Sequence, residues 1–130
     1  MSFYKKSKYK SQKHEIDGIK FDSKAEANYY MQLKLQEKAQ RKPIIKILEI
    51  QPKVYMTDAK ILYKPDFLIS EDGVEIYIDV KGFRTPVFNL KARLWKYYGK
   101  GNLRLVKQVK GGTFAVDKEI ITGEILCIIL

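Results

Sequence analysis

Apolar side chains recur at a helical spacing in two segments of the chain. The first runs from about Lys24 to Arg41, and Pro43 ends it. The second opens at Thr85-Pro86, with threonine as the cap and proline in the first turn. The pattern of an amphipathic helix follows, with basic residues mostly away from one apolar face that comprises Val87, Leu90, Leu94 and Tyr97.

The remaining apolar segments are short, rich in isoleucine and valine, and separated by turn residues, which predicts strands. Residues 44–56 predict a strand pair or one bent strand, because Pro52 interrupts them. Residues 15–21 predict an extended or turn segment around Asp17-Gly18. Further strands are predicted at 61–69, 74–80 and 103–109, and residues 113–130 are expected to be strand-rich.

The order helix, strand, strand, strand, helix, strand predicts an α/β fold, with a mixed central β-sheet flanked by helices. A length of 130 residues fits one domain. We therefore expect a basic arm over residues 1–14, a single domain over residues 15–130, and a strand-rich extension at its C-terminal end.

The arm contains no acidic residue and five lysines. One interpretation is a segment that follows a nucleic-acid backbone, with Tyr4 and Tyr9 stacking on bases. The other is a solubilising tail. The lysines are Lys5, Lys6, Lys8, Lys10 and Lys13.

The net charge of +10 and the pI of about 9.6 favour a nucleic-acid partner over anionic lipid or an ordinary basic surface. Cys127 is the only cysteine and His14 the only histidine, which excludes an intrachain disulfide and a Cys/His zinc cage. Any metal would be held by oxygen, which favours Mg²⁺ or Mn²⁺. No apolar run approaches the ~20 residues that span a bilayer, and no signal core follows the N-terminus, so we expect an intracellular protein without a membrane partner.

Two aspartates fall within predicted strands, where aspartate is uncommon. If Asp72-Gly73 is a two-residue hairpin loop, Glu71 pairs with Val74, and counting outward places Asp66 opposite Asp79. Lys81 shares the face of Asp79, two residues further on. Opposed like charges repel, and a shared divalent cation converts that repulsion into coordination.

Each of these residues also has a structural interpretation. Asp66 follows Pro65 and could lie in a turn, and Asp79 and Lys81 could belong to an exposed polar strand face. Glu26, in the first turn of the first helix, forms a capping-box pattern with Ser23.

The pattern resembles the PD-(D/E)XK nuclease superfamily. Pro65-Asp66 matches the first half of its motif, Asp79-Val80-Lys81 matches the second half, and Glu26 matches the accessory acid of many members. The wider layout from about residue 15 to residue 105 is similar to phage endonuclease I-type Holliday junction resolvases and related small phage and prophage proteins. The resemblance implies an αβββαβ restriction-endonuclease-like core, dependence on a divalent metal, cleavage of phosphodiester bonds in DNA, and action in the cytoplasm of a bacterial host.

The leading hypothesis is therefore a structure-selective DNA endonuclease. Asp66, Asp79 and Glu26 would hold Mg²⁺ or Mn²⁺, Lys81 would position the attacking water, and Gln51 borders the site by resemblance alone. The predicted phosphate contacts are Lys5, Lys6, Lys8, Lys10, Lys91, Arg93 and Lys96.

Two alternatives remain open: a nickase or single-strand nuclease, and a DNA-binding protein without catalysis. The apolar end, residues 124–130, is expected to be buried either in the core or in a homodimer interface.

Overall fold

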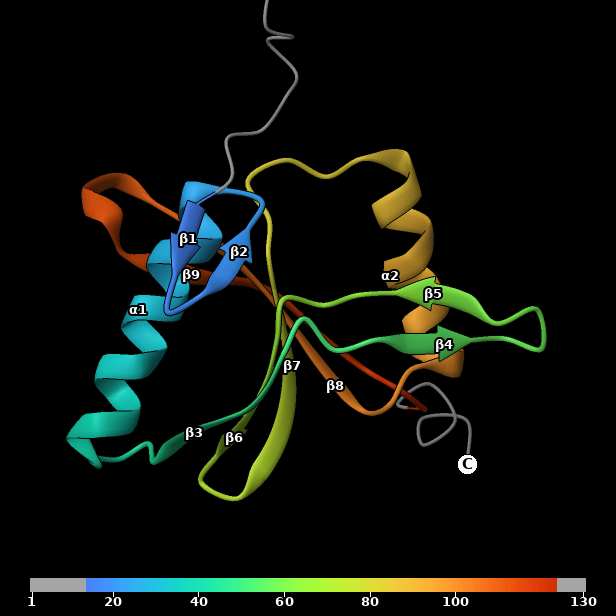
Figure 1. Cartoon of the computed structure of the whole chain (residues 1–130). Coiled ribbons are helices and arrows are strands. Elements are labelled where there is room, and N and C mark those ends of the chain that lie inside the picture. Colours follow the sequence, from blue (N-terminus) through green and yellow to red (C-terminus); the bar gives the residue numbers. More distant parts are fainter. Residues whose placement is uncertain (1–13, 124–130) are drawn as a thin grey trace, which may run out of the picture.

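A computed structural model describes residues 14–123 and shows a five-stranded sheet between two helices, α1 (Lys24–Ala39) and α2 (Pro86–Tyr98) (Figure 1). The β7–β8 pair is parallel and the other neighbours are antiparallel, so the sheet is mixed, and the predicted α/β class is confirmed. The strands lie in the order β3 (Ile45–Ile50), β6 (Phe67–Glu71), β7 (Val74–Val80), β8 (Asn102–Gln108), β9 (Phe114–Ile121).

Helix α1 covers one face of this sheet. It begins after Ser23, whose Oγ accepts a hydrogen bond from the Glu26 amide at 3.1 Å, and it ends where Gln40 adopts a left-handed conformation. Tyr30 and Leu33 on its buried side belong to one core cluster with Phe67 and Ile78 of the sheet. The first core therefore lies between α1 and the sheet.

Helix α2 covers the opposite face and begins, as predicted, at a Thr85 cap followed by Pro86. The prediction of its apolar face was wrong. Phe88, Ala92 and Trp95 are buried against the sheet, whereas the predicted face is largely exposed. The spacing 88, 92, 95 is also helical and carries two large aromatic side chains, whose burial removes more apolar area from water.

Two small hairpins accompany the main sheet: β1 (His14–Ile16) with β2 (Ile19–Phe21), and β4 (Val54–Met56) with β5 (Ile61–Tyr63). The segment at 44–56 is thus a strand pair whose members belong to different sheets. The single strand predicted over 61–69 is wrong: it is divided into β5 and β6. The division falls at residues 64–66, where Pro65 has no amide hydrogen to donate to a ladder.

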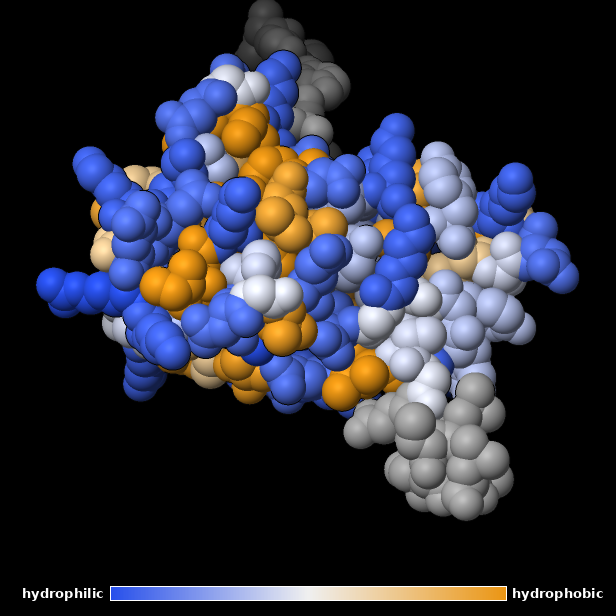
Figure 2. Space-filling view, turned by 90° about the horizontal axis from the view of Figure 1, so that it is seen from below, coloured by the Kyte–Doolittle hydropathy of each residue, from blue (hydrophilic) through white to orange (hydrophobic). Residues whose placement is uncertain are grey.

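Hydrophilic side chains cover most of the face shown in Figure 2, with hydrophobic residues in small groups between them. Within residues 14–123, neither helix has the length and apolar character needed to cross a bilayer.

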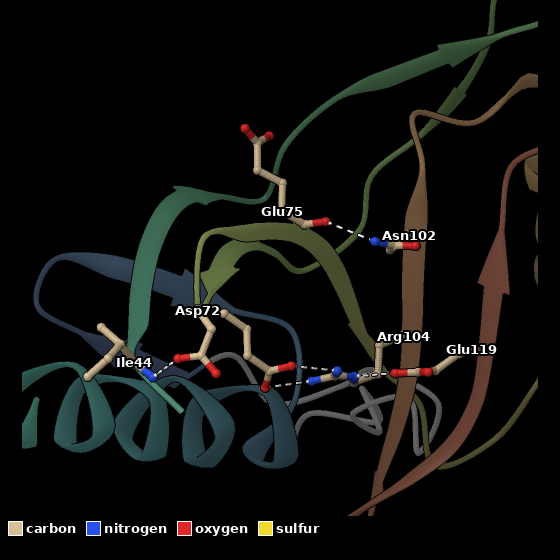
Figure 3. A network of polar contacts seen from close by, with 7 residues as sticks. Ile44, Asp72, Glu75, Asn102, Arg104 and Glu119 are labelled. Carbon is tan, nitrogen blue, oxygen red and sulfur yellow. Dashed lines mark hydrogen bonds and ion pairs between the residues drawn. The ribbon is translucent and has the colours of Figure 1, made fainter. Parts of the chain in front are cut away.

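A polar network fixes the end of the β6–β7 hairpin (Figure 3). The Arg104 guanidinium on β8 donates two hydrogen bonds to the Glu71 carboxylate, at 3.2 and 2.8 Å, and a third to Glu119 on β9 at 2.8 Å. Asp72 accepts a bond from the Ile44 amide at 2.7 Å. The network ties the hairpin turn to the start of β3 on one side and to β8 on the other, and so holds the register of the hairpin.

Several predictions fall on residues outside the described range 14–123. They are the roles of the arm residues Lys5, Lys6, Lys8, Lys10 and Lys13 and of Tyr4 and Tyr9, and the burial of residues 124–130, which include Cys127. At the edge of the predicted arm, His14 already belongs to β1.

Candidate active site

The two aspartates meet at the open end of the β6–β7 hairpin. The strands pair from Glu71 with Val74 through Phe67 with Ile78, and the register predicted from the two-residue turn is confirmed. The ladder stops one step before Asp66, whose amide donates to the Ile78 carbonyl at 2.9 Å. Its carboxylate turns to the end of β7 and accepts the Val80 amide at 2.7 Å. Asp66 therefore lies in the break between β5 and β6, not within a strand.

Asp79 is one of the most deeply buried side chains, with 1% of its surface exposed. The Tyr63 hydroxyl donates to its Oδ2 atom. Its Oδ1 atom is buried and accepts no hydrogen bond from any described residue, and Lys81 Nζ lies 3.6 Å away. A buried carboxylate oxygen without a donor is costly, which indicates a ligand position for a cation.

The electrostatics of the pair give the same indication. Burial raises the pKa of Asp66 far above its usual range, and the charges of Asp79 and then Glu26 raise it further. The close approach of the two carboxyl groups adds to this effect, while the Val80 amide opposes it. Two carboxyl groups in contact need a proton or a metal ion between them.

Tyr63 contributes the donor that orients Asp79. Burial is the largest cause that raises the pKa of its phenol, followed by the negative charge of Asp79. The hydroxyl therefore keeps its proton and always donates to the carboxylate. Tyr63 is the last residue of β5, so it belongs to the small β4–β5 hairpin and not to the main sheet.

Lys81 lies directly after β7, where its amide donates to the Val106 carbonyl at 2.9 Å. Its ammonium group stands 5.1 Å from the centre of the Phe88 ring, a cation–π distance. The side chain is 33% exposed, whereas Asp79 beside it is not. Lys81 therefore connects the buried carboxylate to the surface.

Glu26 takes part in capping α1 and lies in the electrostatic surroundings of the aspartate pair. Burial is the largest cause of a raised pKa for its carboxyl group, followed by the charge of Asp22. Bonds from the Asp22 amide and the Ser23 hydroxyl, and the charge of Lys81, act in the opposite direction. Glu26 thus supports the start of α1 and also interacts electrostatically with both Lys81 and Asp66.

The three acids do not form a preformed metal cage. Within residues 14–123, no three Asp, Glu, His or Cys side chains are grouped closely enough to hold an ion together. The Asp66–Asp79 pair nevertheless fits a hard divalent cation, because it offers an unpartnered carboxylate oxygen. Asp66 and Asp79 would hold the ion, and Glu26 could reach it through one of the waters that Mg²⁺ retains.

The basic residues predicted on α2 are divided between two hollows. Lys91 lines a hollow of about 300 Å³ together with Tyr63, Lys64 and Lys81, next to the aspartate pair. Arg93 and Lys96 line a separate hollow of about 210 Å³. The phosphate contacts of these three residues stay a prediction; around the helix, Lys91 points away from Arg93 and Lys96, which share one hollow.

Gln51 lies beside the site through its backbone. Its amide donates to the Asp66 carbonyl at 2.8 Å, and its side chain donates to the Lys20 carbonyl at 2.9 Å. Tyr63, Lys64 and Phe88 were missed from the sequence. The signal was weak, because the break at Pro65 hides the fact that Tyr63 leaves the main sheet and faces Asp79.

The fold and this site define a mixed α/β protein with a pair of aspartates, Asp79 buried and Asp66 half-buried, and a lysine at one end of its sheet. Residues 6–114 match the model of the family described as "Protein of unknown function (DUF1064)", and the chain belongs to that family. No curated protein and no solved structure matches the chain.

Proposed function

We propose that this protein is a divalent-metal-dependent DNA endonuclease that acts on branched DNA. The observation that carries the proposal is the Oδ1 atom of Asp79, which is buried, faces Lys81 and has no hydrogen-bond donor among the described residues. A structural ion pair would place the lysine in bonding contact and leave the second aspartate elsewhere. Here the second aspartate is in contact with the first.

The chain's own residues divide the work as follows. Asp66 and Asp79 hold the cation, which would supply Lewis-acid activation of a phosphodiester and of a water. Tyr63 fixes the orientation of Asp79 by donating to its other oxygen. Lys81 orients the attacking water or stabilises the charge that develops on the phosphate.

The surroundings of the pair suit a phosphate backbone. Lys64, Lys81 and Lys91 line the hollow beside it, and the chain carries a net charge of +10. The carboxylates alone would repel a phosphate, and a cation between them removes that repulsion. The preference for branched DNA rests on the resemblance to junction resolvases and on the arrangement of apolar and basic residues around α2.

The direct test is incubation of the full chain with labelled four-way, flap, nicked, single-stranded and linear DNA, with Mg²⁺, with Mn²⁺ or with EDTA. We expect cleavage of branched DNA that requires metal and is lost in Asp79→Asn. Asp58→Asn, which changes an exposed turn residue, is the matched control and should cut normally.

The alternatives predict different outcomes. Cleavage confined to nicked or single-stranded DNA would identify the nickase or single-strand nuclease and refute the preference for branches. Tight DNA binding with no cleavage under either metal would refute the nuclease and leave a DNA-binding protein. Equal activity in Asp79→Asn and wild type would show that the aspartate pair is structural.

A further inference from the structure

Helix α2 carries an apolar ridge on the side that faces away from the sheet. Each helical residue advances by about 100°, which places Leu90 and Tyr97 roughly 170° from the buried face and Val87, which also lines the hollow beside the aspartate pair, roughly 110° from it. These three side chains, here called the α2 ridge, are 62%, 52% and 64% exposed. Single exposed apolar residues are ordinary on a protein surface, but a row of them on one helix face indicates a binding surface.

A basic hollow lies on each side of the ridge. The first, the site groove, is the hollow beside the aspartate pair, and its cations are Lys64, Lys81 and Lys91. The second, the basic groove, lies between α2 and β9. Its cations are Arg84, Arg93, Lys96 and Lys118.

The ridge separates the two grooves around the helix. Lys91 points to one side of α2 and Arg93 to the other, and the ridge falls between them on the helical wheel. One acidic residue, Asp117, is paired with Arg84 at the basic groove. Four cations from three segments line this groove, so a positive charge remains there after that pair is counted.

We propose that α2 is a wedge for a nucleic-acid branch point, with the ridge against the base-pair faces exposed where the arms meet and one phosphate backbone in each groove. The ridge offers apolar and aromatic surface to exposed base faces, and the grooves offer cations to two separate backbones. The inference deepens the proposed function, because it assigns the branch preference to particular residues, and only its link to cleavage rests on that function.

Charge complementarity selects this occupant over a second copy of the chain. A dimer formed across the ridge would bring the cationic grooves of two copies together, and like charges oppose association. A branched nucleic acid can neutralise the cations of both grooves at once. A linear duplex offers one backbone path to the site groove, and its stacked base pairs expose no base faces to the ridge.

The test measures DNA binding in EDTA, so it does not depend on cleavage. A four-way junction and a linear duplex of equal length are titrated with wild type and two variants. Leu90→Ser/Tyr97→Ser removes the ridge, and Arg93→Glu/Lys96→Glu reverses charge in the basic groove. Met31→Ser/Leu35→Ser and Arg41→Glu/Lys42→Glu make the same kinds of change at exposed positions on and just after α1. Circular dichroism and the fluorescence of buried Trp95 confirm the fold of each variant.

We expect the ridge variant to lower the ratio of junction to duplex affinity by roughly tenfold, because stacking of one base on a side chain contributes about that much to affinity. The basic-groove variant should lower the salt dependence of junction binding by ~0.9 for each phosphate that it no longer neutralises, with duplex binding nearly unchanged. The control variants should behave as wild type.

Equal ratios in wild type and both variants would overturn the wedge. So would a ridge variant that converts a dimer to a monomer in sedimentation with DNA preference unchanged, since the ridge would then be an interface between copies. Binding of wild type to vesicles with anionic lipid, lost in the ridge variant while junction binding persists, would also overturn it. Junction preference that is lost in the variants without any cleavage by wild type would support the wedge and refute only the nuclease.

Discussion

Replacement of Asp79 by asparagine is expected to stabilise the metal-free protein while it abolishes cleavage. The asparagine has the same shape but no charge, so it removes one of the charges that raise the pKa of Asp66. Its oxygen can accept the bond from Tyr63, and its amide nitrogen, which needs no donor, then takes the position of the unpartnered Oδ1 atom. A native aspartate that weakens its own fold is the pattern expected where the charge serves a ligand.

The size of the effect follows from the burial of this group. A buried acceptor without a donor costs about 1–3 kcal/mol, and we take about 1–2 kcal/mol as recovered, because Lys81 offsets part of the penalty at 3.6 Å. Unfolding entropy of ~2.1 cal/mol/K per residue gives a chain of this length a shift of about 4 °C per kcal/mol. The variant should therefore melt about 4–8 °C higher than wild type in EDTA.

Metal should stabilise wild type much more than the variant. At a concentration of Mn²⁺ or Mg²⁺ near 100 times the dissociation constant, wild type gains ~2.7 kcal/mol, or about 10 °C. Asp79→Asn should gain little, because one of the two carboxylates is lost.

Thermal melts in EDTA and in each metal measure both effects, with Asp58→Asn as the control. A variant that melts lower than wild type in EDTA, or that responds to metal as wild type does, would refute the reasoning.

Lys81→Ala should reduce the cleavage rate by about 10²–10³-fold, as removal of a charge-stabilising donor does, with DNA binding in EDTA changed by less than tenfold. The raised pKa of Asp66 means that the folded state holds a proton that the unfolded chain releases above pH ~4. The contribution of this proton to stability in EDTA is therefore fully present below that pH and is lost as the pH rises toward the raised pKa of Asp66, and urea titrations of Asp66→Asn should show a flatter profile. Tyr63→Phe should weaken metal binding by about 10–100-fold, measured by calorimetry, because Asp79 loses the bond that orients it. Deletion of residues 2–13 should lower the salt dependence of DNA binding, and an unchanged slope would identify the arm as a solubilising tail.

The pattern of apolar residues was sufficient for the helices, the hairpin and the class of fold. The two-residue turn at Asp72-Gly73 fixed the register, because both residues adopt positive φ angles of 49° and 86° that suit such a turn. The pattern failed on α2, where two helical faces compete. The buried one is selected by the size of Phe88 and Trp95, which a count of apolar positions does not weigh.

The candidate site was predictable where it depends on local register and not where it depends on packing. The meeting of Asp66 and Asp79 followed from the hairpin alone. The division of the chain into β5 and β6 at Pro65 could not be predicted, because apolar and aromatic residues continue on both sides of Pro65 and give no sign of a change of sheet. The contact between Tyr63 and Asp79 exists only because β5 leaves the main sheet, so no spacing in the sequence reports it.

The β4–β5 hairpin lies outside the main sheet, yet it supplies the hydroxyl that holds Asp79. Its two ends should therefore differ in how freely they can change during evolution. The turn at residues 57–60 is largely exposed and closed by a bond from the Lys60 amide to the Thr57 carbonyl, so insertions there would leave the main sheet untouched. At the base, a shift of one residue would turn Tyr63 to the other face and leave Asp79 without its donor. Variation in length among relatives should be found at the tip, while the four residues from Tyr63 to Asp66 keep their spacing.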